Sequence, residues 1–270
     1  MTARSLLTRL PAALLAAASV LTGIAQAEIT ISPLRQIVTR TKPTAVYEVS
    51  NASDRIIEGR VGWTDLAAIE TGYAAATPRQ RARLSAAPYL VVSPARFRLE
   101  PGKRARITVT LKDGAQIPAG ERRSHLLVET APARTPLRRA GGGLEADVGL
   151  GVSTPVILRS GLVAPDVAIE ETRLLRDSDG MLELETKLTR RGQYSAYGRF
   201  VAIMDVAGEK TTIAQIDNVS LHVDAQSRKL ALGLGKSALP AGTLSLSYIG
   251  GAEFEGRVFA TKTFEIAAPE

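Results

Sequence analysis

The sequence predicts an all-β protein built from two immunoglobulin-like β-sandwich domains in series. Short segments that alternate apolar and polar residues run through most of the chain, as in half-buried strands. Clusters of Gly, Pro, Asn and Asp separate these segments at the spacing of sandwich turns. The segments also fall into two sets, divided by a short joint at residues 159–161. A chain of 270 residues is long enough for two such domains.

The first 27 residues have the pattern of a secretory signal peptide. Arg4 and Arg9 give a positive start, an apolar stretch covers residues 10–25, and Ala25 and Ala27 form a small-x-small cleavage site. The apolar stretch is about 16 residues long, whereas a membrane-spanning helix needs about 20. We therefore expect an exported protein whose mature chain begins at Glu28 and is not embedded in a membrane.

The first set of segments predicts an N-terminal immunoglobulin-like domain over residues 28–160. Asn51 and the sequence Glu100-Pro101-Gly102 supply turn signals at the ends of two of its strands. The strands expected here cover residues 29–32, 44–51, 56–64, 89–92, 96–99, 104–111, 125–130 and 144–152.

Residues 66–88 interrupt this pattern of strands. They include the basic sequence 77–83, which is typical of a loop, and they are long for an ordinary connection. This segment could be a loop with a function of its own or an insertion that the fold tolerates, and both alternatives remain open.

The predicted strand at residues 144–152 is the most distinctive of the set. It follows a basic, glycine-rich stretch at 138–143 that is typical of a mobile loop. Alternate side chains of a strand lie on one face, so an apolar edge about 30 Å long is expected. That edge could cover the protein's own core or complete the sheet of another protein. Its five apolar residues are Leu144, Ala146, Val148, Leu150 and Val152.

The second set of segments predicts a C-terminal β-sandwich domain over residues 161–270. Turn signals at 177–180 and 240–242 separate some of its strands. The strands expected here cover residues 167–174, 181–188, 197–204, 211–216, 230–234, 244–249 and 257–266.

The composition argues against catalysis, cofactors and nucleic acid. The chain has no cysteine and only two histidines, His125 and His222, so metal sites and Cys/His or Ser/His nucleophiles are nearly excluded. Without the signal peptide the net charge falls from +7 to about +5, and the basic residues are scattered among acidic ones. We therefore expect no enzyme activity, no bound cofactor or metal, and no nucleic-acid partner.

Several short sequences, in this order, resemble the PapD-like periplasmic pilus chaperones. The resemblance covers residues 28 to about 161, whereas the second half matches only in length and strand content. The sequences that carry it are Leu34-Arg35-Gln36-Ile37-Val38, Val49-Ser50-Asn51, Trp63, the run from Pro94 to Gly102, Glu121-Arg122-Arg123-Ser124, and the alternating strand that ends at Val156-Ile157-Leu158-Arg159.

This resemblance implies a fold, a function and a set of partners. Chaperones of this family are two sandwiches joined as a boomerang, and they bind pilus (fimbrial) subunits by donor-strand complementation. The apolar residues of the 144–152 strand would fill the groove of an incomplete subunit, which is then delivered to an outer-membrane usher. The expected location is the periplasm, and self-association of the free protein through the same strand is left open.

The resemblance also implies a cationic anchor for the carboxylate at the end of the subunit. Arg35 matches the first anchoring position, and it has no evident ion-pair partner on an otherwise apolar strand. The second position, usually a lysine four residues before the arginine that ends the seventh strand, is Pro155 here. Arg159 or Arg123 could replace it. The proline at this position indicates a divergent member of the family, as in archaic or alternative pilus systems.

An alternative from a different class is a two-domain β-sandwich that serves as an adhesion or structural module of the cell envelope. It predicts no dependence on the 144–152 strand and no role for Arg35.

Overall fold

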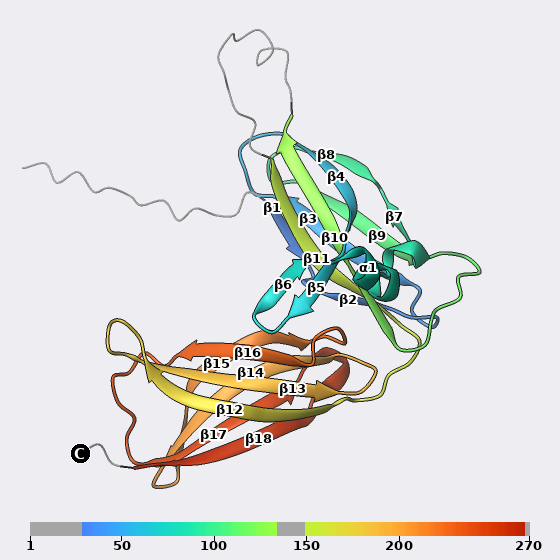
Figure 1. The fold of residues 1–270 in the computed structure, drawn as a ribbon. Helices are drawn as coiled ribbons and strands as arrows, with labels where there is room; N and C mark the ends of the chain where they lie inside the picture. The colour runs from blue at the N-terminus through green and yellow to red at the C-terminus, as the bar shows by residue number, and fades with distance from the viewer. Residues whose placement is uncertain (1–28, 134–148, 268–270) are drawn as a thin grey trace, which may run out of the picture.

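The structure, a computed structural model, describes residues 29–133 and 149–267 and confirms the predicted fold class. Two β-sandwiches follow one another along the chain (Figure 1). The predicted signal peptide lies outside the described residues, as do Leu144, Ala146 and Val148 of the predicted donor strand.

The N-terminal sandwich consists of a four-stranded and a five-stranded sheet. The four-stranded sheet has the order β1-β3-β9-β7, and the five-stranded sheet has the order β2-β11-β10-β4-β8. The strands are β1 (Ile29–Ser32), β2 (Gln36–Val38), β3 (Thr44–Asn51), β4 (Ile57–Thr64), β7 (Leu90–Ser93), β8 (Arg96–Leu99), β9 (Arg104–Leu111), β10 (Glu121–Pro132) and β11 (Leu150–Arg159).

The segment between β4 and β7 is more ordered than the sequence predicted. It forms a two-stranded hairpin, β5 (Leu66–Ile69) with β6 (Gly72–Ala75), then helix α1 (Pro78–Leu84) and the 3-10 turn η1 (Ala87–Tyr89). The interpretation of residues 77–83 as a loop was therefore wrong. Thr77 caps the helix in a reciprocal capping box with Gln80, which outweighs the loop-like basic composition.

The C-terminal sandwich packs a three-stranded sheet, β12-β13-β16, against a four-stranded sheet, β15-β14-β17-β18. Residues 160–165 connect it to β11. Its elements are β12 (Asp166–Arg176), β13 (Leu182–Arg191), β14 (Ala196–Val206), β15 (Glu209–Leu221), β16 (Ser227–Gly233), β17 (Gly242–Gly250), the 3-10 turn η2 (Ala252–Phe254) and β18 (Val258–Ile266).

Each sandwich has a separate apolar core, formed by the inward-facing residues of its alternating strands. Tyr47 is fully buried in the first core, and its hydroxyl donates a hydrogen bond to the carbonyl of Pro155 at 3.1 Å. Tyr248 is fully buried in the second core and donates to the carbonyl of Val219 at 2.9 Å. Both hydroxyls are therefore satisfied, as buried phenols require.

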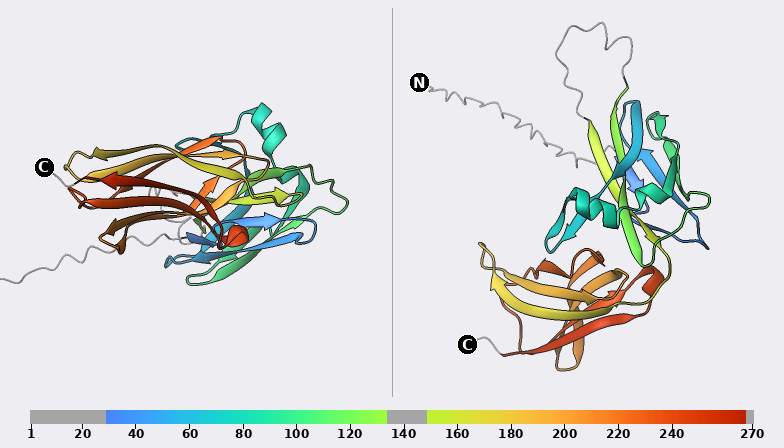
Figure 2. Two further views of the ribbon diagram at one scale, coloured as in Figure 1. Left: turned by 90° about the horizontal axis from the view of Figure 1, so that it is seen from below. Right: turned by 45° about the vertical axis from the view of Figure 1, so that its right-hand side comes forward.

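The two sandwiches are set at an angle, and the β5–β6 hairpin projects from the first toward the second (Figures 1 and 2). The connection at residues 160–165 lies on the other side of this corner. Within residues 29–133 and 149–267, no helix combines the length and apolar character needed to cross a membrane.

Candidate functional site

Two arginines of the N-terminal sandwich meet at the corner between the domains. Arg35 lies in the segment 33–35, where the chain crosses from β1 in one sheet to β2 in the other. Arg159 is the last residue of β11. Because β2 and β11 are parallel neighbours, with Gln36 opposite Val156 and Val38 opposite Leu158, both arginines lie at this end of the same sheet.

Arg35 is not free, in contrast to the expectation from the sequence. Its two Nη atoms donate to the two carboxylate oxygens of Glu253 at 2.6 and 2.9 Å. The guanidinium also lies over the ring of Tyr197, 4.4 Å from the centroid. The side chain is only 8% exposed, so this is a buried, bidentate ion pair.

Arg159 binds the same carboxylate from a second direction. Its Nη1 donates to Oε1 of Glu253 at 2.7 Å, and its Nε donates to Glu121 at 2.7 Å. Its Nη2 donates to the hydroxyl of Ser195 at 3.1 Å. Of the two alternatives for a second cation, Arg159 therefore lies beside Arg35, whereas Arg123 is bound to Asp224 elsewhere in the interface.

Glu253, which the sequence analysis did not single out, comes from the C-terminal sandwich. It sits in the turn η2 between β17 and β18, directly after Ala252, whose φ of +52° is unusual for a residue other than glycine. Phe254 is buried and packs edge-on against Phe259, which fixes the turn. No local sequence signal marks Glu253, because only the angle between the domains brings it to the arginines.

The charge state of Glu253 reflects two opposing effects. Burial acts to raise the pKa of this carboxyl, but the hydrogen bond and charge of Arg35, with the charge of Arg159, hold it below its ordinary value. Glu253 is therefore a carboxylate at neutral pH. With Glu121, which also binds Arg159, two carboxylates balance the two arginines of this site.

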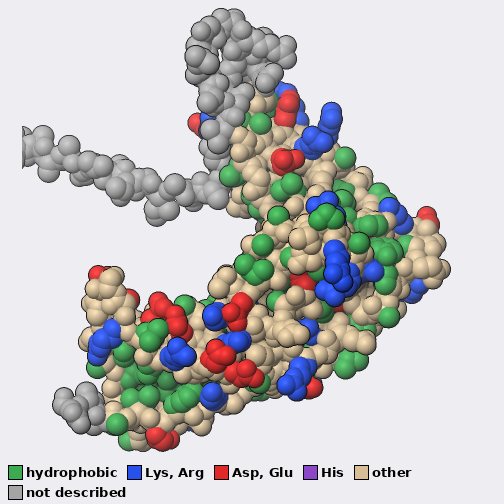
Figure 3. Space-filling view, viewed as in Figure 1, with side chains coloured by type: hydrophobic (Ala, Val, Ile, Leu, Met, Phe, Trp, Pro, Cys, Tyr) green, Lys and Arg blue, Asp and Glu red, His purple; other side chains and the backbone are tan. Residues whose placement is uncertain are grey.

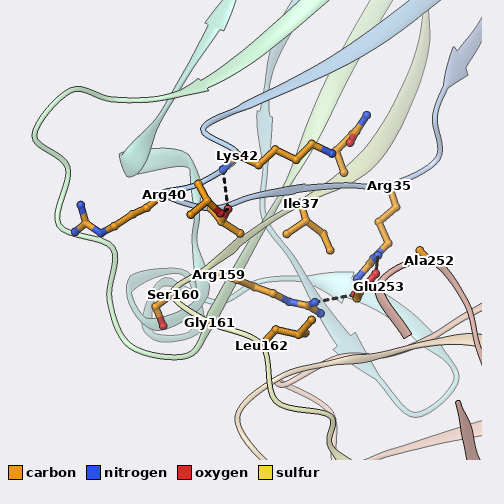
Figure 4. A pocket seen from close by; sticks show the side chains of 13 residues that line it. Arg35, Ile37, Arg40, Lys42, Arg159, Ser160, Gly161, Leu162, Ala252 and Glu253 are labelled. Atoms are coloured by element: carbon orange, nitrogen blue, oxygen red, sulfur yellow. Dashed lines mark hydrogen bonds and ion pairs between the residues drawn. The ribbon is translucent and has the colours of Figure 1, made fainter. Parts of the chain in front are cut away.

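A pocket of about 640 Å³ opens beside this ion pair (Figure 4). Arg35, Arg159 and Glu253 line it together with Arg40 and Lys42, but the side chain of Arg40 points away from Glu253. The Nε atom of Arg35 is buried and has no hydrogen-bond partner. The side chains that line the pocket thus carry a surplus of positive charge, and Arg35 keeps one buried N–H without an acceptor.

The edge of β11 is open next to this pocket. On one side β11 pairs with β10 along its whole length, from Leu150 to Arg159. On the other side β2 pairs only with residues 156–158, so no strand within the described part of the chain pairs with residues 150–155 there, although the hydroxyl of Thr154 donates to the carbonyl of Leu34. Unpaired strand edges of this kind are templates for another strand.

Two of the predicted donor residues lie on this open edge. Leu150 is 43% exposed, and Val152 is half-buried against the core of the N-terminal sandwich. Val156 and Leu158, on the same face further along β11, are fully buried in that core. The apolar face of β11 therefore runs from the core at Val156 and Leu158 to the surface at Leu150, and the binding of another protein to its exposed part stays a prediction.

The β5–β6 hairpin forms a second contact between the domains. Asp224 of the C-terminal sandwich accepts from both Nη atoms of Arg123, at 3.1 and 2.9 Å, and from the amide of Ala68 at 2.6 Å. Glu70 at the hairpin turn accepts from the amide of Lys229 through its carbonyl and from the hydroxyl of Ser227 through its side chain. The hairpin is therefore docked on β16 and the turn before it.

Both histidines of the chain are buried beside this contact. Tyr73 binds Nε2 of His222 through its hydroxyl at 2.7 Å and meets the ring of His125 edge-on. Burial, followed by the charge of Arg123, lowers the pKa of His125 from 6.5 to about 4. The same two causes lower the pKa of His222. Both rings are thus neutral structural residues at pH 7.

The chain is similar in structure to fimbrial chaperones, although no family model and no curated protein matches its sequence. The YadV chaperone shares 12% identity over 89% of this chain and 100% of its own, with a TM-score of 0.47. The E. coli chaperone DraB shares 13% identity over 89% of this chain and 96% of its own, with a TM-score of 0.43. In a complex of the Salmonella enterica SafA pilin with the SafB chaperone, the matched chain shares 15% identity over 88% of this chain and 96% of its own, with a TM-score of 0.45.

Proposed function

We propose that this protein is a periplasmic chaperone that binds pilus-type subunits lacking one strand and delivers them to an outer-membrane usher. The observation that carries the proposal is the open edge of β11 at residues 150–155, which ends at the buried pair Arg35 and Arg159. No catalytic step is part of this function. The strand and the arginines act only by binding.

The register of β2 on β11 explains why the two features belong together. Gln36 lies opposite Val156, so Arg35 lies where the pairing with β2 stops and the free edge begins. A partner strand that runs along residues 150–155 in the same direction as β11 would end at Arg35. Its terminal carboxylate would then reach a pair of arginines, the strongest type of carboxylate partner in proteins.

The apolar face of β11 supplies the energy of this association. A subunit that lacks a strand exposes a groove and unpaired backbone groups, which invite aggregation. A strand paired with β11 would place its groove over Leu150 and Val152, next to the core of the N-terminal sandwich. Each larger side chain that becomes buried contributes about 1.5–3 kcal/mol before the cost of ordering the partner.

The decisive experiment is co-purification of the chain with the secreted proteins encoded beside it, in the wild type and in Leu150→Lys. Leu150 is exposed, so the substitution leaves the free protein folded, but a lysine in the groove would weaken a one-to-one complex at least tenfold. Val91→Lys is the matched control, since Val91 is equally exposed on β7 of the other sheet. An unchanged complex with Leu150→Lys would contradict strand donation.

The alternative, an adhesion or structural module of the envelope, gives the opposite result in the same experiment. Such a module would show no specific complex that depends on β11. The buried arginine pair would then serve only to join the two sandwiches.

A further inference from the structure

The arginine site is already occupied by a carboxylate of the protein itself. Three N–H donors, two from Arg35 and one from Arg159, converge on the carboxylate of Glu253. Both arginines belong to the N-terminal sandwich, whereas Glu253 belongs to the C-terminal sandwich. An incoming carboxylate therefore has to share this site or replace Glu253.

Sharing is disfavoured by electrostatics. Glu121 and Glu253 already balance the charges of Arg35 and Arg159, so a third carboxylate at this buried site would be repelled unless one of the three took up a proton. Replacement is different, because one carboxylate leaves as another arrives and the charge of the site is conserved. Glu253 is 13% exposed and borders the open pocket, so its carboxylate can move into solvent.

Two features indicate that the site can accept a differently placed carboxylate. The Nε atom of Arg35 is buried without a partner, so the guanidinium has a donor that Glu253 does not use. Glu253 also follows Ala252 at a φ of +52°, a conformation that costs free energy for a residue with a side chain. An external carboxylate is not tied to that backbone.

We infer that Glu253 is the resident occupant of an exchangeable carboxylate site, and that a carboxylate from outside the chain takes its place. This inference deepens the proposed function and rests on it for the identity of the natural ligand, the terminal carboxylate of a bound subunit. Glu253 thereby sets the selectivity of the site, because only a carboxylate that binds the arginine pair better than Glu253 is retained.

Chemical rescue with acetate tests the exchange without any protein partner. Glu253→Ala removes the carboxylate partner of Arg35 and leaves Arg159 with Glu121 alone, so its melting temperature falls below that of the wild type. Sodium acetate should raise the melting temperature of this variant by several degrees more than sodium chloride of equal ionic strength. The wild type should show no difference between the two salts, because its site is filled.

Two further variants make the result specific. Glu255→Ala, an exposed residue of the same loop, should behave like the wild type. Arg35→Gln combined with Glu253→Ala should lose the acetate effect. If Glu253→Ala does not fold, Glu253→Ser is measured in its place. Equal stabilisation by acetate and chloride in the truncated variant would overturn the inference.

This test and the test of the proposed function fail independently. Acetate rescue involves only Arg35, Arg159 and Glu253, so it would survive if Leu150→Lys left the subunit complex unchanged. Conversely, loss of the complex in Leu150→Lys would stand even without acetate rescue.

A second inference rests on the separate contact made by the β5–β6 hairpin. Arg123 and Asp224 are 4% and 3% exposed, and their bidentate pair is joined by the amide of Ala68. Glu70 adds ion pairs with Lys187 and Lys229 around the hairpin turn. Figure 3 shows acidic and basic side chains side by side on this part of the C-terminal sandwich.

We propose that the hairpin is a brace that keeps the angle between the sandwiches when Glu253 leaves the arginine pair. This assigns a function to residues 66–75, whose role the sequence left open. Without such a brace, exchange at Glu253 would remove the ion pairs that this carboxylate makes across the corner. The hairpin contacts use none of the atoms of the Glu253 site.

Distances between two spin labels test the brace. The chain has no cysteine, so single cysteines at the exposed positions Glu100 and Ser178 label one sandwich each. Glu253→Ala alone should leave the distance distribution narrow and unshifted, whereas Glu253→Ala combined with Asp224→Asn should broaden it. Tyr73→Phe with Glu70→Ala replaces Asp224→Asn in this combination if that variant unfolds. Broadening by Glu253→Ala alone, or a narrow distribution in both combinations, would overturn the proposal.

Discussion

At the scale of single residues, the two buried histidines make stability depend on pH. His125 has no hydrogen-bond partner on either ring nitrogen, and Arg123 lies close to it, so its charged form is disfavoured in the folded state. Its pKa is about 4 when folded and 6.5 when unfolded. Between these values the unfolded chain binds more protons, so stability falls as the pH is lowered through this window.

We predict that this effect on the free energy of unfolding is on the order of 3 kcal/mol for His125, complete above pH 6.5 and lost by about pH 4. His222, which lies against Tyr73, Arg123 and Arg228, adds a loss of the same sign. Urea unfolding from pH 4 to 7 measures it. The variant His125→Leu should show a shallower slope over this range, and an unchanged slope would contradict the assignment.

A second prediction at this scale concerns Gly198 in β14. A Cβ atom there would clash with the carbonyl oxygen of Ile249 on the neighbouring strand. Gly198→Ala should therefore destabilise the protein by about 2–3 kcal/mol, because backbone cannot move aside as a flexible side chain can. Gly233→Ala on β16, where a Cβ meets nothing within 4 Å, should be nearly neutral. Denaturant midpoints of the two variants provide the comparison.

At the scale of elements, one buried hydroxyl holds the chain between helix α1 and β7. Ser124 of β10 accepts from the amides of Ala86 and Ala87, each at 2.9 Å, and donates to Asp65 at 2.6 Å. Helix α1, just before these amides, buries none of its own residues. The helix is therefore positioned by polar contacts at its ends and not by an apolar face.

We predict that Ser124→Ala lowers the free energy of unfolding by about 2–3 kcal/mol, since it leaves the amides of Ala86 and Ala87 without their acceptor. Thr77→Ala removes only the helix cap and should cost about 1 kcal/mol or less. Hydrogen exchange at Ala86 and Ala87 should accelerate in the first variant and not in the second. Equal exchange in both would show that Ser124 does not hold the connection.

The strands of the two sandwiches were largely predictable from the sequence, whereas the hairpin β5–β6 and the helix α1 between β4 and β7 were not predicted. The alternation in β3 and β9 places Tyr47 and Ile107 inward, as period-two patterning requires. The hairpin β5–β6 escaped prediction because only four residues form each strand and its pairing with the other domain has no local signal. The capping box of Thr77 and Gln80 is a helix signal in the sequence itself, and it outweighs the loop-like basic composition that follows it.

At the scale of the whole molecule, two separate groups of buried ion pairs join the sandwiches. One centres on Glu253 with Arg35 and Arg159, and the other on Asp224 with Arg123. Residues 160–165 already tether the sandwiches, and either contact by itself holds the two surfaces of the other contact close together, which raises their effective concentration. The domains are therefore expected to unfold together as long as one contact remains.

We predict that calorimetry shows one unfolding transition for Asp224→Asn and for Glu253→Ala, and two for the double variant. The double variant should also lose more stability than the sum of the single variants. Additive losses with a single transition would mean that the corner is held mainly by residues 160–165 and not by the two contacts.

The sequence by itself determined the fold class and most of the strands, because side-chain alternation is a local property that each strand carries in its own residues. It also indicated Arg35 and the alternating strand as candidates through resemblance. Tertiary structure alone decided their surroundings: that Arg159 and not Arg123 lies beside Arg35, that Glu253 fills the site, and that the β5–β6 hairpin reaches Asp224. These contacts join residues about 90 to 220 positions apart, and their geometry follows from the angle between two sandwiches, which no local pattern encodes.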